Sequence, residues 1–156
     1  MILAIRTETG LDENVLERLV QEFYSVARQD PLLGPVFDKV KDWEAHIQKI
    51  STFWSSVALM TGRYHGQPMS AHLPLALERE HFERWLVLFE KTALLICTPT
   101  AVTLLMARAN RIAQSLELGI AVNKGVIPAV KLTQADVRQP SPSQNNTKET
   151  SAYNAG

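Results

Sequence analysis

The sequence predicts an all-α protein with a single domain. Apolar residues recur every three or four positions wherever order is expected, which is the period of an amphipathic helix. No segment of useful length shows the two-residue alternation of a half-buried strand, and there is no internal repeat. The 156 residues suffice for one domain with its own core and are too few for two ordinary domains.

The first predicted helix follows Asp12 or Thr9, either of which can cap it, and closes at Asp30-Pro31. Its apolar stripe consists of Leu16, Leu19, Val20, Phe23 and Ala27. The proline- and glycine-rich segment PLLGPVF follows as a turn that ends in Phe37.

A second helix is predicted to begin near Asp42, whose carboxylate caps the backbone N–H of Glu44 or Ala45. It runs to Thr61, and Gly62 is typical of the glycine that terminates a helix. Residues 62–78 contain two prolines and are predicted to be irregular, with His72 on a short helical turn. These assignments place two histidines, His46 and His72, on separate elements.

Two further helices are predicted, over residues 79–97 and from Pro99 to Gly119. The apolar face of the first comprises Phe82, Trp85, Leu86, Phe89 and Ala93. Thr98 supplies an N-capping hydroxyl before proline at the first helical position. The apolar face of the last helix comprises Val102, Leu105, Met106, Ala109, Ile112, Ala113 and Leu116.

The chain after Gly119 differs in composition from what precedes it. Residues 120–133 are mildly β-like but lack a partner strand, and the polar sequence from about residue 136 cannot bury enough surface to offset its ordering entropy. We therefore expect a folded domain over residues 1–119 and a C-terminal extension over residues 120–156, largely disordered from about residue 136.

Composition excludes several functional classes. The 16 basic and 16 acidic residues cancel, so no broad field attracts nucleic acid or an anionic membrane. Cys97 is the only cysteine, which excludes an internal disulfide, a thiolate zinc site and a CxxCH haem attachment, and its apolar surroundings predict a buried, inert thiol. No membrane span or secretory cleavage site is recognisable, so we expect a cytoplasmic protein.

The four histidines lie between Trp43 and Trp85, and two of them occur where a core imidazole needs a partner. His46 shares a helical face with apolar residues, and His72 precedes Leu73 in an aliphatic run, with Leu75 close by. His72 is either a partly exposed loop residue or an iron ligand whose second ring nitrogen donates to a carbonyl. His65 and His81 have the positions of ordinary surface histidines.

Tyr24 and Trp85 add two further polar groups to predicted buried faces. A phenol, an imidazole and an indole from three helices are hard to satisfy mutually, and a polar ligand held between them would satisfy all three. Alternatively, Tyr24 and His46 hydrogen-bond each other or a carbonyl across the core. Lys49, one helical turn after His46, either lies at a pocket mouth or is a solvated lysine.

Five sequence patterns occur together, in order, and each is weak alone. They are FY at Phe23-Tyr24, D-P-x-L-G-P-x-F from Asp30 to Phe37, W-x-x-H-x-x-K-I-x-x-F-W from Trp43 to Trp54, Y-x-G-x-P-x-x-x-H-L from Tyr64 to Leu73 and H-F-x-x-W-L-x-L-F from His81 to Phe89. In this combination the chain resembles the third group of truncated haemoglobins over roughly residues 12–118. The extension after Gly119 departs from the family pattern.

The resemblance implies a two-over-two helical sandwich and non-covalently bound haem b. It implies that His72 is the proximal iron ligand and that Tyr24, His46 and Trp85 form the distal polar group, which would be catalytic in an enzyme. His46 either contacts the ligand or gates the pocket. The residues implied to contact or back the haem are Phe23, Phe37, Ile50, Phe53, Trp54, Val57 and Leu73, with Lys49 and Tyr64 as partners of its propionates.

The function implied is binding of O₂ and other diatomic ligands, NO and CO, at a pentacoordinate iron. A polar distal pocket favours O₂ retention, nitric oxide dioxygenase activity or peroxidase-type activity over O₂ delivery, and turnover requires an unidentified reductase. The alternative from another class is a cofactor-free helical interaction module. There is no HExxH, no paired ExxH, no glycine-rich phosphate loop and no GxSxG to suggest other chemistry.

Overall fold

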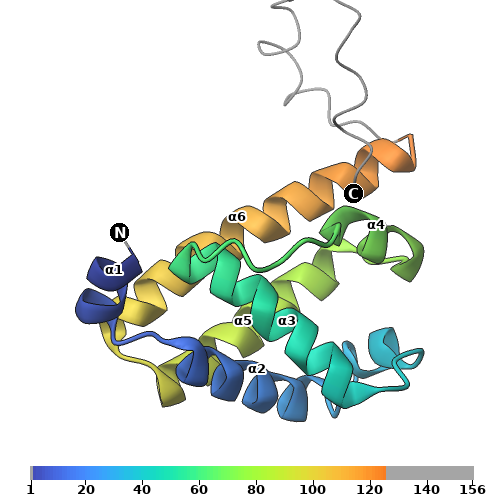
Figure 1. Ribbon diagram of the computed structural model, residues 1–156. Helices are drawn as coiled ribbons and strands as arrows, with labels where there is room; N and C mark the ends of the chain where they lie inside the picture. The colour runs from blue at the N-terminus through green and yellow to red at the C-terminus, as the bar shows by residue number, and fades with distance from the viewer. Residues whose placement is uncertain (1, 126–156) are drawn as a thin grey trace, which may run out of the picture.

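The computed structural model describes residues 2–125, and within them the protein is entirely helical, as predicted (Figure 1). Its elements are α1 (Ile2–Thr9), α2 (Glu13–Ala27), η1 (Gly34–Phe37), α3 (Trp43–Leu59), α4 (Pro68–His72), η2 (Leu73–Leu75), α5 (Arg79–Ile96) and α6 (Pro99–Asn123). Helix α2 packs on α3 and α5, and α6 packs on α5 and α3, which gives the two-over-two sandwich. None of the helices in residues 2–125 has the length and apolarity to cross a membrane.

The predicted helix starts are confirmed by their caps. The Asp12 carboxylate accepts a hydrogen bond from the Val15 backbone N–H at 2.8 Å, and Asp42 accepts one from Ala45 at 3.1 Å. The Thr98 hydroxyl accepts from the Ala101 N–H and also donates to the Thr9 carbonyl at 2.7 Å. This last bond ties the start of α6 to α1, a helix that the sequence analysis did not predict.

Three predicted helix ends are wrong. Helix α2 ends at Ala27, three residues before Asp30. Helix α3 ends at Leu59, and the left-handed residue that caps it is Met60, with φ of 60°, rather than Gly62. Helix α6 does not end at Gly119 but continues to Asn123, so residues 120–123 are helical rather than β-like. Continuation is favoured because Ile120 is buried there in a cluster with Leu116. The rest of the extension, including the segment predicted to be disordered, lies outside the described residues.

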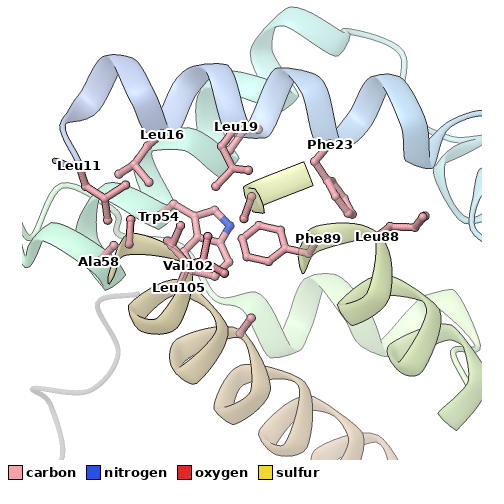
Figure 2. Close-up of a cluster of buried hydrophobic side chains, with 14 of the residues drawn as sticks. Leu11, Leu16, Leu19, Phe23, Trp54, Ala58, Leu88, Phe89, Val102 and Leu105 are labelled. Carbon is pink, nitrogen blue, oxygen red and sulfur yellow. The ribbon is translucent and has the colours of Figure 1, made fainter. Parts of the chain in front are cut away.

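The apolar interior consists of two clusters. The larger joins α2, α3, α5 and the first half of α6, and Figure 2 shows Trp54 and Phe89 facing each other at its centre, next to Leu16 and Leu19. The smaller cluster consists of Leu77, Phe82, Ala113, Leu116 and Ile120, with Met69 and Leu73 packed against it. Helix α4, which carries His72, therefore packs against the smaller cluster and the second half of α6 (Figure 1).

The turn between α2 and η1 depends on Asp30, which is only 7% exposed. Its carboxylate accepts hydrogen bonds from the backbone N–H groups of Leu32 and Leu33, at 3.1 and 3.0 Å. It also forms an ion pair with Arg84 of α5 at 2.7 Å. The bond from the Arg84 guanidinium is the main reason that the pKa of Asp30 is lowered. The same turn requires glycine at position 34, because a Cβ there would lie 2.8 Å from the Arg28 carbonyl oxygen.

Replacing Asp30 by asparagine should lower the free energy of unfolding at pH 7 by about 1–2 kcal/mol, because a charged acceptor is lost. A lowered folded-state pKa contributes stability above the unfolded-state value, near pH 4, and that stability is lost as the pH falls further. The difference between wild type and Asp30→Asn should therefore shrink between pH 7 and pH 3, as measured by urea unfolding. Asp38→Asn, on the exposed end of η1, is the control, and a difference independent of pH would contradict the role of the charge.

Candidate functional site

A pocket of about 340 Å³ lies between the two apolar clusters, with walls from both. Its apolar lining comes from the α2–α3 connection, α3, the α4–η2 segment, α5 and the second half of α6. These residues are Leu33, Val36, Phe37, Val40, Ile50, Phe53, Trp54, Pro68, Ala71, Leu75, Leu77, Phe82, Trp85, Ile112, Ala113 and Leu116. The polar lining consists of Tyr24, Lys39, His46, Lys49, Tyr64, His72 and His81.

His72 enters the pocket from the last residue of α4 and is half-buried. Its Nδ1 lies 2.6 Å from the Pro68 carbonyl oxygen, one helical turn earlier. A carbonyl can only accept, so Nδ1 must carry the proton and donate. In the neutral form of the ring the lone pair is then on Nε2, which is the state required of a metal ligand.

Tyr24 of α2 and His46 of α3 meet at the pocket, where the phenol oxygen lies 3.3 Å from His46 Nε2. Burial raises the pKa of Tyr24, so the phenol keeps its proton at neutral pH. The pKa of His46 is lowered, first by desolvation, then by the positive charge of Lys49 and by repulsion from His72 when that imidazole is protonated. Both groups are therefore neutral, and either can donate in their shared hydrogen bond.

Trp85 of α5 lines the pocket and is held there by a stack of aromatic rings. Its ring is nearly parallel to Phe89, with centroids 5.2 Å apart, and Phe89 stacks in turn on Trp54 at 4.9 Å. Trp85 also meets Phe23 edge-on at 6.0 Å. The position of the indole is thus set by the main core.

Tyr24 and His46 bond each other, which is the alternative that the sequence left open, so these two groups do not need a ligand to be satisfied. Among residues 2–125, every fully buried side-chain nitrogen or oxygen has a hydrogen-bond partner. The hydrogen bond between Tyr24 and His46 does not explain why a pocket lies beside them. An apolar pocket of about 340 Å³ falls in the range of small-molecule and cofactor sites.

No protein-family model matches the chain. A search of curated proteins finds similarity to the group 3 truncated hemoglobin ctb of Campylobacter jejuni, with 32% identity over 113 residues that span 69% of this chain and 89% of the relative. A crystal structure of the group III truncated hemoglobin from the same organism matches with a TM-score of 0.65 and 33% identity, and the match covers 69% of this chain and 89% of the other.

The chain belongs to the group 3 truncated haemoglobins. Membership in this globin family implies a haem-binding role, and the residues around the pocket fit a haem. The walls are apolar, as a porphyrin plane requires, and one of the lining histidines, His72, has a ring nitrogen freed for coordination. The exposed Lys39 and Lys49 supply cations at the edge for carboxylates.

Most of the residues singled out in the sequence come together in this globin pocket. Those that line it are Tyr24, Phe37, His46, Lys49, Ile50, Phe53, Trp54, Tyr64, His72 and Trp85. Three others do not line it. Phe23 is 3% exposed and packs behind Tyr24 and Trp85, Val57 packs against the main core, and Leu73 packs against the smaller cluster.

Part of the lining was not predicted from the sequence. Ile112, Ala113 and Leu116 were assigned only to an apolar helix face, and nothing in their spacing indicates that the face borders a pocket. His81 was predicted to be an ordinary surface residue, yet it is half-buried and lines the pocket. Its Nδ1 accepts a hydrogen bond from the Glu78 backbone N–H at 3.0 Å, which fixes the start of α5.

Proposed function

We propose that the pocket binds haem b without covalent attachment and that the protein binds O₂ and other diatomic ligands there. The observation that carries the proposal is the hydrogen bond from His72 Nδ1 to the Pro68 carbonyl, which leaves Nε2 as a neutral ligand beside an apolar cavity. When bound, haem supplies an iron that coordinates small ligands and exchanges electrons. His72 is the proximal ligand in this proposal.

The remaining residues of the pocket would hold the haem, shield it from water and present polar groups to its ligand. The apolar side chains exclude water from the porphyrin faces, and Lys49, Lys39 and Tyr64 are the candidates to bind the propionates. Tyr24, His46 and Trp85 present the polar groups available to a diatomic ligand. Because His46 is bonded to Tyr24, the proposal keeps it out of the iron coordination sphere, so that the iron is pentacoordinate before a ligand binds.

The polar group favours ligands that acquire negative charge. A hydrogen bond to a charged group contributes about 1.5–3 kcal/mol, equivalent to about one to two decades in affinity. Such a pocket is suited to retaining O₂ and to reacting with nitric oxide or peroxide, as a nitric oxide dioxygenase or a peroxidase. Either activity requires an electron donor, and we propose that a reductase is this partner.

The Tyr24–His46 hydrogen bond also favours a second candidate function, a cofactor-free helical interaction module with a satisfied polar pair. The two candidates differ in one simple property. A haem protein shows a Soret band when purified or after addition of haemin, whereas the module stays colourless and folded.

Replacing His72 by alanine should abolish or redirect iron ligation, because among the described residues neither of the other two pocket histidines, His46 and His81, has Nδ1 bonded to a carbonyl and Nε2 left free. The measurement is the optical spectrum of the ferric, ferrous and CO-bound forms, with added imidazole tested for recovery of the wild-type spectrum. His65→Ala, an exposed histidine that does not line the pocket, is the matched control. An unchanged spectrum and unchanged CO binding in His72→Ala would refute the assignment.

Replacing Tyr24 by phenylalanine should speed O₂ dissociation severalfold or more, up to about a hundredfold, because the phenol donor is lost. Stopped-flow ligand displacement measures this rate. Dissociation of CO, a less polar ligand, should change less in the same variant. Identical O₂ dissociation in wild type and Tyr24→Phe would mean that the phenol does not contact the ligand.

A further inference from the structure

Helices α2 and α3 are joined by a second pair of side chains just outside the pocket. The guanidinium carbon of Arg28 lies 4.1 Å from the centre of the Trp43 ring, a cation–π contact. Arg28 follows Tyr24 by four residues and Trp43 precedes His46 by three, so the two pairs bridge the same helices one turn apart. Neither Arg28 nor Trp43 lines the pocket.

The Trp43 ring contacts both members of the inner pair. Its centroid lies 5.4 Å from the centroid of His46, with the planes at 79°, and 5.4 Å from that of Tyr24. Phe37 completes the group, 5.9 Å from Trp43 and 5.3 Å from Tyr24. The rings of Tyr24, Trp43 and His46 therefore form a nearly equilateral triangle, with Tyr24 and His46 5.2 Å apart, and the position of the imidazole depends on where the indole lies.

We propose that Arg28 and Trp43 are positioning residues that hold His46 against Tyr24 and thereby decide which polar groups face a ligand in the pocket. Arg28 acts through Trp43, since its exposed guanidinium lies over the Trp43 ring. The consequence for ligands rests on the proposed function. The positioning itself is a property of the chain and can be tested without haem.

The physical basis is the difference between an ordered and a free imidazole. His46 is half-buried, and the groups that act on its charge are Lys49 of its own helix and His72 of α4. If Trp43 no longer confines the ring, His46 gains solvent and separates from Tyr24. A residue that only filled space would change stability and the solvation of His46 and leave the contacts between His46 and Tyr24 unaltered.

The test is a histidine titration by NMR on the full-length protein without haem. Wild-type His46 should titrate below the ordinary histidine value of about 6.5, and Trp43→Leu should move it up towards that value and weaken ring-to-ring contacts between His46 and Tyr24. Arg28→Met should act in the same direction by a smaller amount. Arg18→Met, an exposed arginine of the same helix, is the control and should leave His46 unchanged.

Removing the Arg28 charge can itself raise the pKa of His46, and a double variant separates the two effects. The charge effect persists when Trp43 is leucine, whereas the positioning effect does not. Arg28→Met should therefore shift His46 more in the wild-type background than in Trp43→Leu. Equal shifts in both backgrounds would overturn the role of Arg28.

A second arm uses the haem-loaded protein and the C–O stretching band of added CO, which should gain a further component in Trp43→Leu and in Arg28→Met but not in Arg18→Met. Failure to take up haem would refute the proposed function and leave the NMR test intact. Trp43→Phe keeps a ring and should give a smaller shift, and it replaces Trp43→Leu if that variant does not fold. An unchanged His46 titration with unchanged Tyr24 contacts in a folded Trp43 variant would overturn the inference.

Discussion

The stack of Trp54, Phe89 and Trp85 connects the hydrophobic core to the pocket wall. Trp54 comes from α3 and the other two rings from α5, and the separations of 4.9 and 5.2 Å are those of well-packed aromatic pairs. Trp54 and Trp85 both line the pocket, while Phe89 is buried between them. The core therefore ends at the pocket in packed aromatic rings, which set the position of the Trp85 indole.

The features that could be predicted from the sequence are those set by residues close together along the chain. Asp12, Asp42 and Thr98 cap helices through hydrogen bonds three residues along the chain, so their spacing alone identifies them. Helix α1 could not be predicted in this way, because a helix of eight residues is marginal by itself and depends on packing against α6. One of its contacts, from Thr98 to Thr9, joins residues 89 positions apart.

Gly119 illustrates the same limit. Its position near the end of an apolar pattern is typical of a glycine that terminates a helix, yet it lies inside α6. A Cβ at this position would meet the terminal carbon of Met69, on the element that carries His72. The glycine makes room for a side chain 50 residues earlier, which no local pattern contains. The pocket residues of α6 were missed for the same reason.

The two polar arrangements in the pocket differ in how they would respond to a bound group. His72 is fixed by a bond to the backbone of its own helical turn and needs no other residue to hold its tautomer. His46 is held only by side chains, Tyr24 of α2 and Trp43 of its own helix, so its position can change when one of them moves. The first is suited to a permanent ligand and the second to a group that responds to what enters the pocket.

The apolar walls give a reason why the pocket favours occupancy. Apolar surface left in contact with water forfeits about 25 cal/mol per Å² relative to its burial, so a pocket of this kind reduces the stability of the empty protein. A group that binds the folded chain and not the unfolded chain restores stability in proportion to the logarithm of its concentration over its dissociation constant. Tyr24 and His46 satisfy each other by a hydrogen bond, so they leave no unpaired polar atom in the described pocket. The surrounding apolar residues supply the driving force for binding. Polar satisfaction and an apolar pocket are thus complementary features of one site.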